Sequence, residues 1–344
     1  MLSDTNNAFS QEVLRLRAEY QHRRQKSNVF PPAGQPILDV KLNHGERPYM
    51  GIWYDAGDGE TVSRYIRLFN LPGTLSGDIL RLNHNLPPVP PGHFEIEGDI
   101  LRPLPNYPSP PEPLEDDTED TSDLIALLPI IPINPSTHFL KRPKYRSEIL
   151  NLLHLQGGTC PGTRRSPHII HLLGASAAGD LVFDKLATCG ATLGRFSSLA
   201  TYKRWLLHLL SALASLHAAG IVHRDLRIDN LLFADGGERL VVCDLEGRWG
   251  QRAAPEVAWE GGPDESGWSE RSDVYDVGAV VKGMVYANAP ITPMVEWPVP
   301  GALGRVVEAC MRAVPEERAT VGELREMVEG IEVEDRPSDG VVLG

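Results

Sequence analysis

The chain has 344 residues, enough for one sizeable domain and a smaller one, and its 42% hydrophobic and 23% charged residues are typical of a folded protein. Its 33 basic and 46 acidic side chains give a net charge of −13, which argues against nucleic acid or a membrane surface as the main partner. The four cysteines are far apart, no secretion signal is visible, and no apolar stretch is long enough to cross a bilayer. We therefore expect a reduced cytoplasmic protein, with the nucleus left open.

The first 123 residues are expected to hold a helix, a small β module and a linker. Residues 9–26 favour a helix with only a thin apolar stripe, so we assign 1–35 to a partly frayed surface helix or a tail. Alternating segments separated by glycine, proline and asparagine predict a β-rich module over 36–103, with strands at 37–42, 49–56, 61–69, 78–82 and 93–101. Residues 104–123 are rich in proline and then in acid, which predicts an extended linker.

The pattern over 124–332 predicts an α+β domain, followed by a tail over 333–344. A short amphipathic helix at 147–155 precedes two strands, at 167–174 and 179–186. Residues 200–220 place leucines at spacings of three and four, and a glycine ends the segment. This segment is expected to be a long core helix.

The stretch IVHRDLRIDNLLF carries an acid, Asp225, and an amide, Asn230, after a short apolar run. Another apolar run ends in Asp244. On neighbouring loops, one carboxylate can accept a proton from an attacking hydroxyl, while the amide oxygen and the second acid bind a hard divalent cation beside phosphate oxygens. Phosphoryl transfer needs little more than this positioning and charge neutralisation, so the pattern predicts a phosphoryl-transfer site.

HRDLRIDN is similar to the HRDLxxxxN loop of the eukaryotic protein kinase family, and the likeness extends along the chain. CDLEG stands where the family has its DFG motif, and AAPEV matches its APE motif. SDVYDVGAVV resembles the helix that begins with a structural acid, here Asp273, and PEERATVGEL resembles the terminal subdomain. The resemblance implies a bilobal fold with a small β-rich N-lobe over 124–186 and a mainly helical C-lobe over 187–332. Aminoglycoside-type kinases share the spacing from acid to amide but lack the APE-like segment and the helix that begins with Asp273.

The resemblance also implies roles for single residues. Asp225 would be the catalytic base, and Arg227 would take the place of a lysine that contacts phosphate. Lys141, paired with Glu148, would anchor the nucleotide phosphates. The other implied residues are the magnesium ligands Asn230 and Asp244, the nucleotide contacts Asp184, Leu186 and Leu232, and the structural pair of Arg318 and Glu256. The cofactors would be ATP and Mg²⁺, and the substrate a protein, with Ser or Thr favoured over Tyr.

The nucleotide side departs from the family. Residues 123–139 contain prolines and no glycine, so we expect no glycine loop that cradles phosphate. Phe139 stands where the family has an alanine against the adenine ring, so its phenyl group would occupy the adenine site or shift the base, unless the strand is offset in register. The short separation between Lys141 and Glu148 predicts a truncated helix.

The segment that follows Asp244 is short as well. Residues 245–255 contain no Ser, Thr or Tyr, so we expect no phosphorylation there, and Arg224 has no local phosphate to receive. Glu246 replaces the glycine of the family motif.

Two hypotheses follow for the function. In the first, which the retained catalytic positions favour, the chain is an ATP- and magnesium-dependent protein kinase of weak or atypical activity. In the second, the chain is a pseudokinase that binds or scaffolds a partner protein, with the module at 36–103 as the binding part. Nothing in the sequence indicates an oligomeric state.

Overall fold

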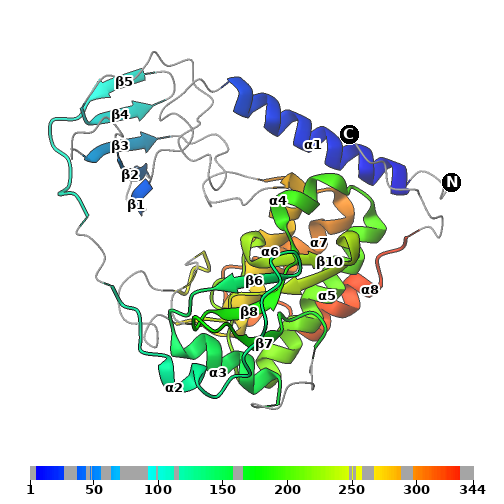
Figure 1. Cartoon of the computed structure of the whole chain (residues 1–344). Helices are drawn as coiled ribbons and strands as arrows, with labels where there is room; N and C mark the ends of the chain where they lie inside the picture. Colours follow the sequence, from blue (N-terminus) through cyan, green and yellow to red (C-terminus); the bar gives the residue numbers. More distant parts are fainter. Residues whose placement is uncertain are drawn as a thin grey trace. The chain divides into compact units, whose positions relative to one another are not determined.

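The computed structural model describes residues 5–26, 37–43, 47, 49–55, 63–69, 92–97, 100–111, 116–157, 166–247, 250, 253–257, 267–287 and 297–333. They form a mixed α+β structure (Figure 1) in two compact units. Unit 1 comprises Met1–Leu16, Asp117–Ala289 and Pro298–Gly344, and unit 2 comprises Arg17–Asp116 and Pro290–Trp297.

Unit 2 contains a five-stranded sheet in the order β1-β2-β3-β4-β5. The strands β1, β2 and β3 are antiparallel, β3 pairs in parallel with β4, and β4 pairs antiparallel with β5. Buried apolar side chains at alternate positions, Ile66 with Leu68 and Phe94 with Ile96, form part of its core. The strand bounds are Ile37–Asn43, Tyr49–Asp55, Ser63–Phe69, Phe94–Glu97 and Ile100–Pro103, so the strand predicted at 78–82 lies outside the described residues.

Helix α1, Thr5–Lys26, is more buried in its first half than the thin apolar stripe suggested. Phe9, Val13 and Leu16 are buried, at spacings of four and three that place them on one face. The Phe9 ring packs edge-on against Tyr202, with 5.4 Å between ring centroids. This half of the helix is therefore a packed part of unit 1, because a few large apolar side chains suffice to anchor a helix.

Unit 1 contains a three-stranded antiparallel sheet in the order β6-β8-β7, with bounds His138–Lys141, Leu181–Asp184 and Leu172–Ala175. Helix α3, Arg146–Leu155, buries Ile149, Leu152 and Leu155, as the amphipathic pattern predicted. The prediction of one strand over 167–174 is wrong in its first half. There Ile170 N donates to Val242 O at 2.8 Å and Val242 N donates to His168 O at 2.8 Å, so that half pairs with β11 instead.

The chain before β6 runs along the opposite edge of this sheet. Ala175 N donates to Pro129 O at 2.9 Å, and Ile131 N donates to Ala175 O at 2.8 Å. Gly174, at φ +156°, permits this approach, because a Cβ there would lie 2.2 Å from Pro129 O. Among the described residues, β6 is consequently paired with β8 alone and its outer edge is uncovered.

The rest of unit 1 is mainly helical. Helix α5, Leu199–Ala218, begins at the N-cap Ser198 and buries Leu206, Leu209, Leu213 and Leu216, which confirms the predicted core helix. A small sheet in the order β11-β10-β9 lies beside it. The remaining elements are α2 Ser122–Ile125, β9 Ala187–Thr188, α4 Cys189–Thr192, β10 Leu231–Ala234, β11 Arg239–Val242, α6 Glu270–Tyr286, α7 Gly301–Cys310, α8 Val321–Glu329, and the 3₁₀ turns Leu193–Arg195, Ile228–Asn230, Asp235–Gly237 and Pro315–Glu317.

The acidic part of the expected linker contacts unit 1 closely. Glu119 Oε2 accepts a hydrogen bond from the backbone N of Arg146 at 2.8 Å, and Asp117 Oδ2 accepts one from the Tyr145 hydroxyl at 2.7 Å. The Arg146 guanidinium donates to both carboxylate oxygens of Asp123. These carboxylates hold the first turn of α3, so residues 117–123 belong to unit 1 rather than to a free linker.

The structure also bears on the predicted ion pair of Arg318 and Glu256, on the cysteines and on membrane-spanning helices. Arg318 Nη1 and Nη2 lie 2.6 and 2.7 Å from the two carboxylate oxygens of Glu256, so the predicted ion pair is present. Of the cysteines that the structure describes, Cys189, Cys243 and Cys310 are free thiols. Across the described ranges, no helix combines the length and apolar character needed to cross a membrane.

Candidate functional site

A cavity of about 290 Å³ in unit 1 is lined by residues of the β6-β8-β7 sheet, α3, the β9-β10 strands and the loop after β11. Eight of its lining residues were singled out from the sequence: Phe139, Lys141, Glu148, Asp184, Leu186, Asn230, Leu232 and Asp244. Segments more than a hundred residues apart in the chain, from Phe139 to Asp244, therefore meet at one place.

Lys141 lies at the centre of a carboxylate cluster beside this cavity. Its Nζ is 2.8 Å from Glu148 Oε1, 2.5 Å from Asp244 Oδ1 and 3.5 Å from Glu246 Oε1. The predicted pair of Lys141 and Glu148 is therefore present. The sequence analysis noted Glu246 only because it replaces the glycine of the family motif. Its contact with Lys141 was not predicted.

Burial and charge act in opposite directions on these groups. Burial raises the pKa of Glu148, and the nearby Lys141 ammonium group offsets only part of this rise. Burial and then the charge of Asp244 raise the pKa of Glu246. Burial alone would lower the pKa of Lys141, but the charges of Glu148 and Asp244 outweigh it and hold that pKa above its ordinary value. Lys141 therefore stays cationic.

The loop between α5 and β10 holds Asp225 and Asn230 together. Asn230 Nδ2 donates to the Asp225 carboxylate at 2.9 Å and to the Asp225 backbone oxygen at 2.8 Å. These bonds orient the carboxylate and leave the amide oxygen of Asn230 for another partner. An acid held in this way can accept a proton, and the amide oxygen can ligate a hard cation.

Buried polar contacts from α6 hold this loop in place. The Asp273 carboxylate, fully buried in α6, accepts hydrogen bonds from His223 N at 2.8 Å and Arg224 N at 2.9 Å, and its Oδ2 lies 2.9 Å from His217 Nε2. Arg224 adopts φ +69° and Asp244 adopts φ +65°, the left-handed region that non-glycine residues rarely enter. The surrounding bonds hold the backbone in these strained conformations.

Two arginines singled out from the sequence, Arg227 and Arg224, each have a partner within the protein. The Arg227 guanidinium is paired with Asp229, with Nε 3.0 Å from Oδ2. The sequence did not single out Asp229, which lines the cavity. Arg224 lies over the Trp268 ring, with 5.7 Å from Cζ to the centroid. The indole face thus supplies an electrostatic partner where no local phosphate is available.

Phe139 is one of the aromatic residues that line the cavity. Its side chain lies on the same face of β6 as Lys141, two residues away, and both line the cavity. Phe139 is 53% exposed, so its ring is only partly packed. The volume of about 290 Å³ lies at the lower end of the range of small-molecule sites.

The donor set fits Mg²⁺ better than the walls fit ATP. The carboxylate of Asp244 and the amide oxygen of Asn230 are hard oxygen ligands, which Mg²⁺ prefers. Lys141 suits a phosphate oxygen. In the proline-containing segment 123–139, residues 129–131 pair with Ala175 at the outer edge of β7, so the backbone N–H of Ile131 is used within the sheet.

Sequence reasoning missed several residues of the site. Ile170, Phe183 and Thr188 line the cavity, as does Cys243, whose burial raises the pKa of its thiol to about 12. The apolar residues gave no signal beyond ordinary strand character. Glu246 could have been found from its spacing of two from Asp244, but only the position of α3 brings Glu148 to the same point.

Comparisons with known proteins point to protein kinases. No family model matches the chain. Over 93 residues the chain is 39% identical to cyclin-dependent kinase F-1 of Oryza sativa subsp. japonica. The matched segment covers 23% of this chain and 19% of that kinase. Over 116 residues it is 29% identical to mitogen-activated protein kinase kinase kinase mom-4 of Caenorhabditis briggsae. This second matched segment covers 31% of this chain and 21% of that kinase. The chain spans about a fifth of the length of these curated relatives. These partial similarities support a relationship to protein kinases at that coarse level.

Proposed function

We propose that this chain is a protein-kinase-like phosphotransferase, which transfers the γ-phosphoryl group of ATP to a Ser or Thr hydroxyl of a protein in the presence of Mg²⁺. The observation that carries the proposal is the convergence of Lys141, Asn230 and Asp244 on one cavity, with Asp225 hydrogen-bonded to Asn230. We also propose that the β6-β8-β7 sheet with α3 corresponds to a reduced N-lobe, and the mainly helical part to a C-lobe.

In the proposed reaction the oxygen of the substrate hydroxyl attacks the γ-phosphorus, and the bond from that phosphorus to the bridging oxygen of ADP breaks. Asp225 accepts the hydroxyl proton. Lys141 binds phosphate oxygens and orients them, while Asp244 and Asn230 would hold Mg²⁺. When bound, the cation would neutralise the charge that gathers on the phosphate oxygens.

A second candidate is a pseudokinase that works by binding a partner protein. The position of Phe139 beside Lys141 favours it, because a phenyl ring in a cavity of about 290 Å³ competes with a nucleotide base. The proline-containing segment along β7 supports the same reading, because it provides no cradle for phosphates.

Two measurements separate the candidates. Binding of ATP to the full chain is measured with and without Mg²⁺, and phosphate transfer to a general protein substrate is measured for wild type and Asp225→Asn. For a phosphotransferase we expect magnesium-dependent turnover that falls by about 10²- to 10⁴-fold in Asp225→Asn, with ATP affinity retained.

Absence of ATP binding at about 1 mM nucleotide, the upper end of ordinary KM values, would reject the phosphotransferase. Turnover that survives Asp225→Asn unchanged would reject the assigned base. Glu326→Gln, an exposed acid of α8, is the control and should leave turnover unaltered.

A further inference from the structure

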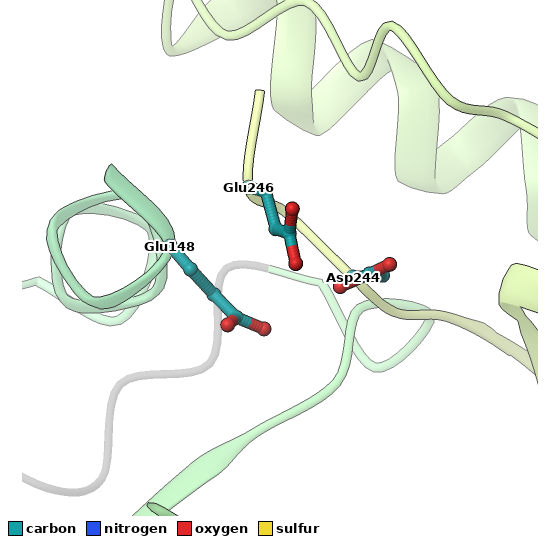
Figure 2. A group of neighbouring side chains, drawn as sticks. All are labelled: Glu148, Asp244 and Glu246. Carbon is teal, nitrogen blue, oxygen red and sulfur yellow. The ribbon is translucent and has the colours of Figure 1, made fainter. Parts of the chain in front are cut away.

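Three carboxylates converge at one point, two of them from residues that line the cavity: Glu148 from α3, and Asp244 and Glu246 from the loop after β11 (Figure 2). One ligating oxygen of each lies within 4.8 Å of the other two. Figure 2 shows the Glu148 side chain extending from its helix toward the loop that carries the other two acids. The arrangement joins segments that are a hundred residues apart in the chain.

The charges of this cluster are unbalanced. Lys141 Nζ contacts all three carboxylates and carries a single positive charge. Like charges at these separations repel strongly where water is scarce, and one ammonium group offsets only one of the three. A divalent cation in place of the ammonium group would reduce the net charge of the cluster from −2 to −1, because it supplies a second positive charge.

An unsatisfied oxygen points to a missing ligand. Glu148 is 3% exposed, and its Oε2 is buried with no hydrogen-bond partner, while Oε1 accepts from Lys141. A buried carboxylate oxygen without a partner is costly, and natural structures satisfy nearly all such atoms with a donor, a water or an ion. The oxygen sits on a side chain that extends into the cluster, so a cation there would satisfy it.

We propose that Glu148, Asp244 and Glu246 bind a divalent cation in the absence of nucleotide, with Lys141 moved aside. Three carboxylates are hard ligands and select a cation of the Mg²⁺, Mn²⁺ or Ca²⁺ class over soft metals. Lys141 has a flexible stem and a partly exposed side chain, so it can leave the centre of the cluster. This site shares Asp244 and Lys141 with the proposed phosphotransfer site, but it adds Glu148 and Glu246 as ligands and needs no nucleotide.

The test is a titration of the full chain with Mn²⁺, with no nucleotide present, in which electron paramagnetic resonance reports the free ion. We expect one Mn²⁺ per chain, displaced by excess Mg²⁺ or Ca²⁺. Glu246→Gln should weaken binding at least about tenfold, and Glu148→Gln should do the same. Lys141→Met should tighten binding, because the ammonium group no longer competes. Glu326→Gln, an exposed acid of α8, is the control and should bind as wild type does.

Several outcomes would overturn the assignment. They are no Mn²⁺ binding up to about 10 mM, beyond the weakest natural calcium modules, equal affinity in wild type and Glu246→Gln, or weaker binding in Lys141→Met. Should Glu246→Gln fail to fold, Glu246→Gly removes the same carboxylate. Because no nucleotide is present, a negative result leaves the Asp225-dependent transfer assay untouched, and failure of that assay leaves this titration untouched.

Discussion

The two sides of the cavity differ in how firmly their side chains are held. On the helical side, Asp273 is fully buried and accepts two backbone hydrogen bonds from the loop that carries Asp225. On the sheet side, Phe139 and Leu140 of β6 are 53% and 40% exposed, and the outer edge of their strand is uncovered among the described residues. The loop that carries Asp225 is thus held by buried polar contacts, whereas the apolar side chains of β6 are only partly packed. Mutations should therefore act unequally on the two sides.

The largest effect is expected from Asp273→Ala. The change leaves the backbone N–H groups of His223 and Arg224 buried without an acceptor, and it removes the partner of His217. We expect a loss of about 3–5 kcal/mol in the free energy of unfolding, measured with urea. Glu270→Ala, at an exposed position of the same helix, should cost less than about 1 kcal/mol. A similar loss in both variants would remove the contrast between buried and exposed support.

A pair of identical substitutions compares the two sides directly. Leu245, which follows Asp244, is 1% exposed, whereas Leu140 of β6 is 40% exposed. Leu245→Ala should lower the free energy of unfolding by about 2–4 kcal/mol, because it leaves a cavity in a packed site. Leu140→Ala should lower it by less than about 1 kcal/mol. If the two losses were equal, the sheet side would be as tightly packed as the helical side.

Phe139→Ala tests whether this ring limits the cavity. Removing the phenyl group should enlarge the base end of the site and improve ATP affinity by about three- to tenfold, or roughly 1 kcal/mol. Leu140→Ala is the matched control, because its side chain points to the other face of β6 and should leave affinity unchanged. Affinity is measured by calorimetry in the presence of Mg²⁺. A weaker affinity in Phe139→Ala would mean that the ring contacts the base rather than blocking it.

The smallest effect concerns a histidine pair on the helical side. His208 stacks on His168 with 4.0 Å between ring centroids, and its Nδ1 accepts from Leu240 N at 3.3 Å. Burial, followed by the charges of His168, Arg204 and Arg239, lowers the pKa of His208 to about 4. This value lies below the ordinary histidine value of 6.5, so the unfolded chain takes up the proton first as the pH falls. The contribution of His208 to stability is thus complete above pH 6.5 and is lost between that pH and about 4.

Urea unfolding at pH 7 and pH 5 measures this effect. Because His208 is half-buried and solvent screens its charge, wild type should lose only about 1 kcal/mol more than His208→Gln over this interval. The glutamine keeps an acceptor for Leu240 N and does not titrate. An equal loss of unfolding free energy in wild type and His208→Gln, or a larger loss in His208→Gln, would contradict a lowered pKa of His208 in the folded protein.

The sequence predicted best where local pattern and packing agree. The core helix α5 and the short amphipathic helix α3 were predicted nearly to the residue, because each buries one regular face. The burial of α1 was missed, because it depends on Tyr202, far along the chain. The contact of Glu246 with Lys141 was also missed, because side-chain direction in an irregular loop follows from tertiary packing. The roles of the site residues in nucleotide binding and transfer stay predictions.

The contacts of the acidic segment also change where this chain can be cut. Composition alone suggested a boundary at residue 124, yet carboxylates at 117, 119 and 123 hold the first turn of α3, and Phe9 packs on Tyr202. Unit 1 is thus discontinuous in sequence, because residues 17–116 and 290–297 belong to unit 2. A truncated protein that starts at residue 124 would lose interactions at two separate places.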